Sequence, residues 1–282
     1  MKITTLIENR ASTTEPNLNS EWGLSLHIEY NDYSILFDTG ASDSFANNAK
    51  QLSIKIDSVQ VAVLSHHHFD HGGGLKRFLV LNTNAKVYLA DVPNGDCYIK
   101  IFGPLKKYIG LNKTVLADYR ERFVTVNKPT EILPDVFIIP HILGTRPMPI
   151  GNKKLCLCKN RKFILDDFAH EIVMAINDSG KLVIFTGCSH NGILNMVDAV
   201  SKRFVGVPIK AVIGGFHLVS SPPFNFMAET RNEVENLGKS VLNYPIETTY
   251  TGHCTGKKAF AILKSVMGDK IKDMRTGSCF EI

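Results

Sequence analysis

The sequence predicts a layered α/β fold, and two features of its 282 residues lead to that prediction. The first half contains short runs rich in β-branched and aromatic residues, KITTLIEN, LSLHIEY and YSILFDTG, which are typical of strands. From KLVIFTG at 181–187 onward, apolar strand patterns alternate with helical patterns. Strands that alternate with helices indicate layers of sheet and helix.

The remaining elements follow from local patterns. In the first half we expect helices at 44–52 and 74–82, and strands at 59–65, 85–90 and 136–140. Residues 170–178 and 181–187 predict a hairpin, because Asp178-Ser179-Gly180 is a good turn sequence. In the second half we expect helices at 193–204, 228–243 and 257–268, and strands at 209–215, 246–252 and 271–282.

Residues 91–131 differ from the rest, because Pro, Gly, Tyr and Lys are mixed there without a clear period. We interpret this segment as a lid or insertion over a site, with a plain surface excursion as the alternative. No stretch rich in Pro, Gly or Ser divides the chain. The sequence therefore predicts one domain over 1–282.

The composition limits the possible functions. Hydrophobic residues make up 44% and charged residues 21%, which is ordinary globular usage. The net charge of +5 is spread along the chain, so it suits a small anionic substrate and leaves no footprint for nucleic acid. No apolar window of membrane-spanning length and no signal peptide is evident, so we expect a cytoplasmic protein with reduced thiols at its six cysteines.

One short stretch, VLSHHHFDHGGG, holds four histidines and an aspartate within six positions. His66 and His68 lie two positions apart at the end of an extended segment, so both side chains can point to the same side. Asp70 and His71 follow where the chain turns, and the glycines at 72–74 allow the backbone to approach an ion closely. The loop therefore presents two pairs of metal ligands to neighbouring points.

Imidazole and carboxylate ligands suit zinc, iron or manganese. We expect two divalent ions, with zinc favoured over iron and manganese, about 3.5–4 Å apart so that they share a hydroxide. That metal-bound hydroxide would attack an ester, amide or phosphoester, while Asp70 orients the nucleophile and accepts its proton. His67 lies between the ligands and points the other way, so it is expected to make no metal contact.

The pattern His66-x-His68-x-Asp70-His71 after an apolar strand resembles the signature of the metallo-β-lactamase superfamily. The resemblance implies an αββα four-layer sandwich with a dinuclear metal centre where strand-end loops converge. FDTG resembles the acidic motif that ends an early strand in that superfamily. By that analogy Asp38 would hold a ligand imidazole in place, with a turn-capping role as the alternative.

The second half must supply the remaining ligands. FTGCSHNG and TGHCTG each follow an apolar run and sit among glycines, as loops of functional sites do. On the resemblance, His190 and His253 are the expected ligands. Cys188 is either a ligand of the second metal or a small buried residue.

Other side chains compete for these roles. His170 and Glu171 are candidates for the middle ligand, although neither has the register that the superfamily uses. His141 is a further candidate and is expected to be structural. His217, in GGFHL, would bind substrate or act as an acid, and an ordinary loop histidine is the alternative.

The combination of HHHFDHGGG, TGCSHNGI, GGFHL and TGHCTG is similar to a narrower, dihydropterin-related group. That group takes its name from 7,8-dihydropterin-6-methyl-4-(β-D-ribofuranosyl)aminobenzene 5'-phosphate synthase. The resemblance implies a metal-dependent hydrolase acting on an ester, phosphoester or related anionic small molecule. Two alternatives stay open: a di-iron redox protein and a non-catalytic metal-binding sensor.

Overall fold

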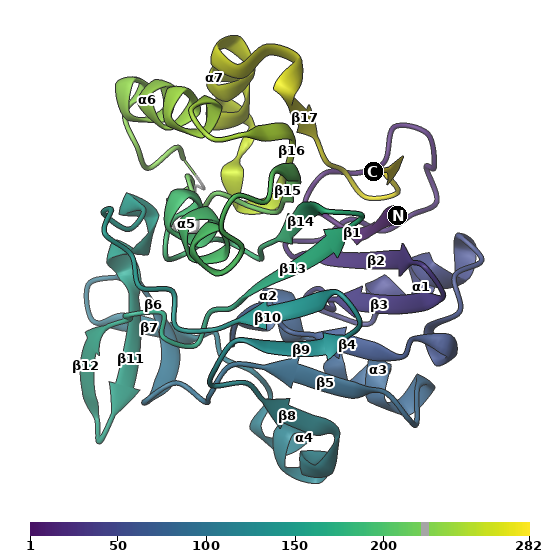
Figure 1. Cartoon of the computed structure of the whole chain (residues 1–282). Coiled ribbons are helices and arrows are strands. Elements are labelled where there is room, and N and C mark those ends of the chain that lie inside the picture. The colour runs from purple at the N-terminus through teal and green to yellow at the C-terminus, as the bar shows by residue number, and fades with distance from the viewer. Residues whose placement is uncertain (221–225) are drawn as a thin grey trace. The chain divides into compact units, whose positions relative to one another are not determined.

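The computed structural model describes residues 1–220 and 226–282 (Figure 1). The chain forms two compact units, and each contains more than one segment of the sequence. Unit 1 comprises Met1–Asp91, Gly110–Asn127 and Met274–Ile282, and unit 2 comprises Val92–Ile109 and Lys128–Asp273.

Unit 1 is a seven-stranded sheet packed against short helices. Its strands, in spatial order, are β18 (Cys279–Glu281), β1 (Lys2–Ile7), β2 (Ser25–Tyr30), β3 (Tyr33–Phe37), β4 (Val61–Val63), β5 (Lys86–Leu89) and β8 (Phe123–Thr125). The pairs from β18 to β3 are antiparallel, and those from β3 to β8 are parallel. The helices are α1 (Ser44–Gln51), α2 (Phe69–Gly72), α3 (Leu75–Leu81) and α4 (Lys113–Asp118).

The core of unit 1 explains why its helices form where the sequence predicts. Leu36 and Val87 project from the sheet into a cluster with Phe45 of α1 and Phe78 of α3, and all four are fully buried. Burial of large apolar side chains of this kind contributes roughly 1.5–3 kcal/mol each. The expected helices at 44–52 and 74–82 are thereby confirmed within a residue or two at each end.

Unit 2 has a second seven-stranded sheet and three longer helices. Its strands, in spatial order, are β17 (Ile271–Asp273), β16 (Ile246–Thr251), β15 (Ile209–Ile213), β14 (Lys181–Phe185), β13 (Val173–Asp178), β10 (Val136–Ile139) and β9 (Thr130–Leu133). The helices are α5 (Ile193–Arg203), α6 (Arg231–Leu242) and α7 (Lys257–Met267), and α6 and α7 pack side by side (Figure 1). The predicted alternation of strand and helix is confirmed here.

Two features of the sequence fix the order of this sheet. β13 and β14 pair antiparallel around Ser179 and Gly180, both of which have positive φ, so the predicted hairpin is confirmed. β14, β15, β16 and β17 pair parallel, with α5, α6 and α7 as the intervening helices. The ends of the parallel strands therefore lie at one edge, where their loops carry the polar residues.

Unit 2 also contains a four-stranded antiparallel sheet that the sequence did not predict. It consists of β12 (Lys162–Leu165), β11 (Leu155–Lys159), β6 (Asp96–Phe102) and β7 (Leu105–Tyr108). The β11–β12 turn places both Asn160 and Arg161 at positive φ, as a tight hairpin requires. The sequence of this turn, KNRK, resembles an ordinary charged loop, so it did not indicate a hairpin.

The segment 91–131 is divided in the structure. Residues 92–109 form β6 and β7 in unit 2, whereas 110–127 carry α4 and β8 in unit 1. Its role as a lid stays a prediction.

The expected terminal strand over 271–282 is wrong. β17 ends at Asp273 and β18 begins at Cys279, and the two belong to different sheets. The chain turns between them at Gly277, which has φ +80° and donates its backbone N–H to the Thr5 carbonyl oxygen. In the described ranges, no helix has the length and apolarity needed to span a membrane.

The glycine run after His71 gives a test of how tightly the backbone packs in unit 1. A Cβ at Gly73 would collide with the Ala41 carbonyl oxygen, a backbone atom that side-chain rotation cannot move. We expect Gly73→Ala to lower the free energy of unfolding by about 3 kcal/mol, measured by urea denaturation.

Gly206→Ala is the matched control, because a Cβ there meets nothing within 4 Å and only its φ of +79° is unfavourable. That change should cost about 1 kcal/mol. Equal losses for the two variants would contradict the close packing at Gly73.

Candidate metal centre

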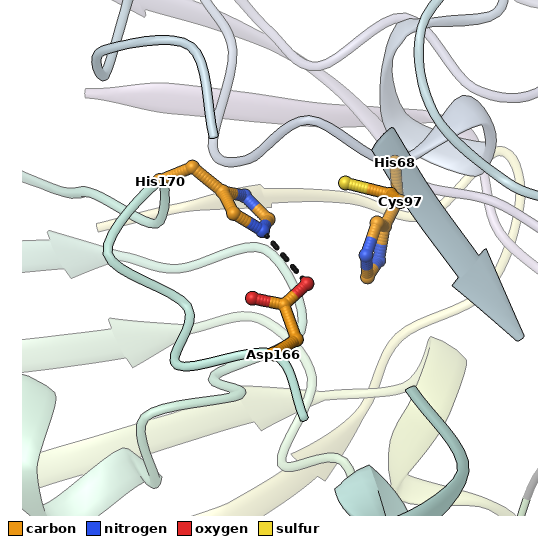
Figure 2. A group of neighbouring side chains, drawn as sticks. All are labelled: His68, Cys97, Asp166 and His170. Atoms are coloured by element: carbon orange, nitrogen blue, oxygen red, sulfur yellow. Dashed lines mark hydrogen bonds and ion pairs between the residues drawn. The ribbon is translucent and has the colours of Figure 1, made fainter. Parts of the chain in front are cut away.

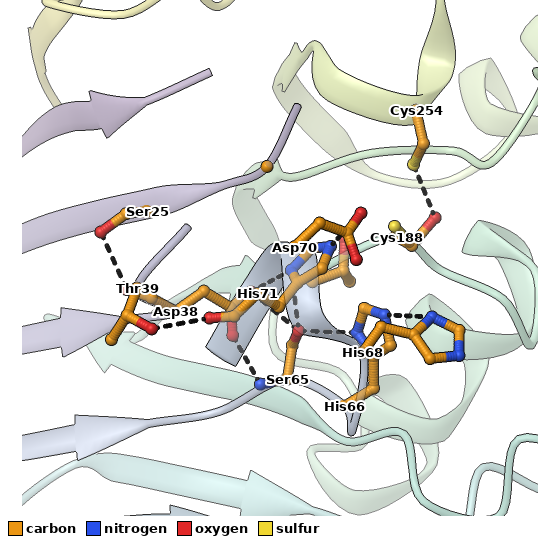
Figure 3. Close-up of polar contacts among 12 residues, drawn as sticks. Ser25, Asp38, Thr39, Ser65, His66, His68, Asp70, His71, Cys188 and Cys254 are labelled. Atoms are coloured by element: carbon orange, nitrogen blue, oxygen red, sulfur yellow. Dashed lines mark hydrogen bonds and ion pairs between the residues drawn. The ribbon is translucent and has the colours of Figure 1, made fainter. Parts of the chain in front are cut away.

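The histidine loop of unit 1 begins directly after β4 and runs into α2. His66, His68, Asp70 and His71 are all buried. His66 Nε2 and His68 Nδ1 lie 3.1 Å apart, and the His71 ring lies 4.2 Å from that of His66, centroid to centroid (Figure 3). His67 points elsewhere and donates from Nε2 to the Ala90 carbonyl oxygen at 3.0 Å.

A buried carboxylate, that of Asp38, orders this loop. Its Oδ1 accepts the Ser65 backbone N–H at 2.7 Å, and its Oδ2 accepts both the Ser65 hydroxyl and the His71 Nδ1–H at 2.7 Å (Figure 3). A carboxylate accepts only, so the proton of neutral His71 lies on Nδ1 and its Nε2 keeps a lone pair. That Nε2 lies 3.8 Å from the Asp70 carboxylate.

Ser65 determines in the same way which nitrogen of His66 carries the proton. Its single hydroxyl hydrogen is donated to Asp38, so Ser65 Oγ accepts from His66 Nδ1–H at 2.9 Å. His66 Nε2 therefore also keeps a lone pair.

These donors fit a transition-metal ion. Two nitrogens bound to one tetrahedral ion at about 2.0–2.1 Å lie roughly 3.3 Å apart, close to the 3.1 Å between His66 Nε2 and His68 Nδ1. Imidazoles whose other nitrogen is hydrogen-bonded, directly or through a hydroxyl, to a carboxylate are the common metal-binding arrangement. The loop can thus offer one pair of donors from His66 and His68 and another from Asp70 and His71.

Unit 2 contributes a second cluster, at the ends of its parallel strands. Cys188, His190 and His217 each place a donor atom within 4.8 Å of the other two, and a nitrogen of His253 lies equally near the Cys188 sulfur. Cys188, His190 and His253 are nearly inaccessible to solvent.

The proton of His190 can be located from its neighbours. The Asn152 amide donates to the His190 carbonyl oxygen at 2.7 Å, so its Oδ1 faces His190 Nδ1 at 2.8 Å and must accept from it. The proton of His190 is therefore on Nδ1, and Nε2 keeps the lone pair that a metal requires. Phe168 stacks on the same ring, with 4.3 Å between centroids.

Glu171 holds the His190 loop and is therefore a positioning residue. Its buried carboxylate accepts the backbone N–H groups of His190 and Asn191, each at 2.8 Å, and the Asn191 side chain at 2.9 Å. Burial raises the pKa of this carboxyl group, although these hydrogen bonds oppose the rise. In this role Glu171 uses both carboxylate oxygens.

Cys254 joins the same neighbourhood. Its sulfur lies 3.5 Å from the Cys188 carbonyl oxygen. Burial opposes ionisation of this thiol, but contacts with Cys188, His253 and His217 outweigh burial and bring its pKa well below the usual value.

His170 belongs to a different group. Its Nε2 lies 3.1 Å from the Asp166 carboxylate, and Cys97 lies within 4.8 Å of both (Figure 2). Burial raises the pKa of the Cys97 thiol, and the negative charge of Asp166 adds to that rise. His141 lies outside these clusters, exposed at the end of β10 with φ +53°.

Some positioning residues were missed by sequence reasoning. Ser65 directly precedes the first ligand and could have been noticed for that reason. Asn152 carries no local signal, and its role depends on contacts 38 positions along the chain. Cys254 adjoins His253 in TGHCTG and was overlooked beside it.

Comparisons with known proteins agree with this architecture. Residues 23–92 match the family model described as the metallo-beta-lactamase superfamily. A protein of Methanocaldococcus jannaschii named 7,8-dihydropterin-6-methyl-4-(beta-D-ribofuranosyl)-aminobenzene-5'-phosphate synthase is 33% identical over 272 residues, covering 92% of this chain and 89% of that protein.

Two solved structures are also similar. Tm1679, described as a metal-dependent hydrolase of the beta-lactamase superfamily, matches with a TM-score of 0.78 and 28% identity over 100% of this chain and 99% of its own. Zn(2+)-bound PqqB from Methylobacterium extorquens matches with a TM-score of 0.58 and 10% identity over the whole of both chains, and shares the fold.

The chain belongs to the metallo-β-lactamase superfamily. Within that superfamily, it resembles the dihydropterin synthase of M. jannaschii over nearly its whole length. The predicted fold class is therefore confirmed, and proteins of this fold bind metal ions.

Asp38 gives a test of how the histidine loop is held. We expect Asp38→Asn to weaken zinc binding 10- to 100-fold, because the amide has an NH₂ donor in place of one acceptor oxygen. Either the Ser65 backbone N–H, or the Ser65 hydroxyl and His71 Nδ1–H, would then lose their acceptor. Competition with a chromophoric chelator measures the affinity, and circular dichroism shows whether the variant is folded.

Asp43→Asn is the control, since Asp43 is exposed and makes no side-chain capping bond at α1. If Asp38→Asn bound zinc as tightly as this control, Asp38 would not orient the ligands.

Proposed function

We propose that this chain is a metal-dependent hydrolase that acts on an ester, phosphoester or related anionic small molecule. Its resident cofactor would be two divalent ions, with zinc favoured over iron and manganese. The proposed ligands are those named from the sequence: His66, His68, Asp70, His71, Cys188, His190 and His253.

One observation supports this proposal most strongly. His66, His71 and His190 each have Nδ1 hydrogen-bonded to a buried oxygen acceptor, so each keeps a lone pair on Nε2. Packing in a core does not require a hydrogen bond at Nδ1. The occurrence of this bond at three separate histidines therefore favours metal binding. Superfamily membership supports the same reading.

The proposed roles follow from the side chains. Bound divalent ions would lower the pKa of water to about 7 and stabilise negative charge on a reacting oxygen. Asp70 has a carboxylate oxygen 3.8 Å from His71 Nε2 and would orient the attacking water and accept its proton. His217, whose ring lies 4.1 Å from that of His190, would donate a proton to the leaving group or bind substrate.

The substrate class rests on charge and on the relatives. The chain carries a net charge of +5, which favours an anion. The M. jannaschii relative is named for a product with a 5'-phosphate, and Tm1679 is described as a hydrolase. A di-iron redox protein and a non-catalytic sensor remain the competing functions, which metal analysis and turnover assays separate.

His68 provides the direct test. We expect His68→Ala to remove at least one metal equivalent and to lower hydrolysis of bis(4-nitrophenyl) phosphate at least 100-fold, because the loop loses one of its paired nitrogens. Elemental analysis measures metal content independently of activity.

His141→Asn serves as the matched control, because His141 is exposed and asparagine tolerates its positive φ. Unchanged metal stoichiometry in His68→Ala would refute the ligand assignment. Stoichiometric iron with flavin-dependent reduction would favour the redox protein, and full metal loading with no turnover on phosphoesters, lactones and thioesters would favour the sensor.

A further inference from the structure

Unit 2 contains a cavity of about 260 Å³, and none of the proposed metal ligands lines it. Its walls come from the loop at 146–150, the start of α5, the segment after β15, and α6 with the residues before it. The lining is mostly apolar and includes Met148, Ile193, Leu194, Phe216, Leu218 and Leu237. A dry cavity of about 150 Å³ accepts a benzene ring, so this one has room for one or two rings.

Glu229 lines this cavity and has one carboxylate oxygen without a hydrogen bond from the described residues. Its Oε1 accepts the Ile150 backbone N–H at 2.9 Å. Its Oε2 is buried and accepts no hydrogen bond from any described residue. A buried acceptor left in this state destabilises the fold, and a donor on a ligand would recover that loss.

Arg146, at the same cavity, does not satisfy Glu229. Its guanidinium donates to the Tyr244 hydroxyl at 3.0 Å and to Asp198 at 3.5 Å. Glu233 is the other charged residue of the lining, and its Oε2 already accepts from the Thr230 backbone N–H and hydroxyl. Glu229 is therefore the carboxylate of the lining that favours a ligand with N–H donors.

The cavity adjoins the metal cluster of unit 2. Ile150 lines it, and a Cβ on the next residue, Gly151, would lie 3.0 Å from the His217 ring. Phe216 and Gly192 also line it, one residue from His217 and two from His190. The cavity therefore shares its walls with the segments that carry His190 and His217.

We propose that this cavity binds a flat apolar group carrying nitrogen donors, with those donors on Glu229 Oε2. The group would be the part of the substrate that is not attacked, and this second statement rests on the proposed function. Glu229 would then select among anionic substrates by the group that each one carries at a distance from its reacting centre.

Benzamidine is a suitable probe, because it is planar, cationic and offers two N–H donors to a carboxylate. We expect saturable shifts of the Leu218 and Leu237 methyl resonances in the zinc-loaded full-length protein. Glu229→Gln should weaken binding at least tenfold, because glutamine can still accept from Ile150 but places an NH₂ group where Oε2 stands. Glu235→Gln, on α6 outside the cavity, is the matched control, and benzoate should not bind.

The outcomes separate the two parts of the proposal. No saturable binding of benzamidine, or equal binding to wild type and Glu229→Gln, would overturn the donor-binding cavity. Binding that shifts the methyl groups but leaves the ring resonances of His190 and His217 unchanged would overturn its role as a substrate subsite. Neither readout needs turnover, so failure of the hydrolase assay alone would count against the proposed function and not against the cavity.

Discussion

The geometry of the histidine loop depends on one buried carboxylate at the end of β3. An ionised carboxylate without partners is costly to bury, and Asp38 avoids that cost by accepting from Ser65 twice and from His71 once. The same bonds decide which nitrogen of His71 and of His66 carries the proton. The hydrogen bonds of one buried acid thus determine both the orientation and the tautomer of two imidazoles in the following loop.

Unit 2 reaches an equivalent result with different groups. There a buried Glu171 holds the backbone of the loop, and an amide, that of Asn152, fixes the ring of His190. Left-handed backbone recurs after the strands of both units, at Asp38, Ser189, His217 and His253. Such conformations cost about 1–3 kcal/mol each in residues other than glycine and collect at functional sites.

The sequence was most informative where structure is local. Apolar strand patterns that alternate with helical patterns located β14 to β16 and their helices. Buried strands and buried helix faces each give a recognisable spacing of apolar residues. The β11–β12 hairpin escaped detection, since its turn at Asn160 and Arg161 looks like a charged loop. The loop from His66 to His71 was recognisable because its residues are adjacent. Asn152 and Glu229 were not, because their roles arise from contacts made far along the chain.

The placement of β18 has a consequence for synthesis. Residues 279–281 form the edge strand beside β1. Just before them, the Thr276 hydroxyl accepts from the Glu8 backbone N–H and donates to the Glu8 carbonyl oxygen. The unit 2 sheet ends with β17 at Asp273. During synthesis, β18 follows the whole of unit 2, so one edge of β1 stays open to unwanted pairing until residues 279–281 have left the ribosome. The sheet of unit 1 is therefore completed only after the sheet of unit 2 has been synthesised.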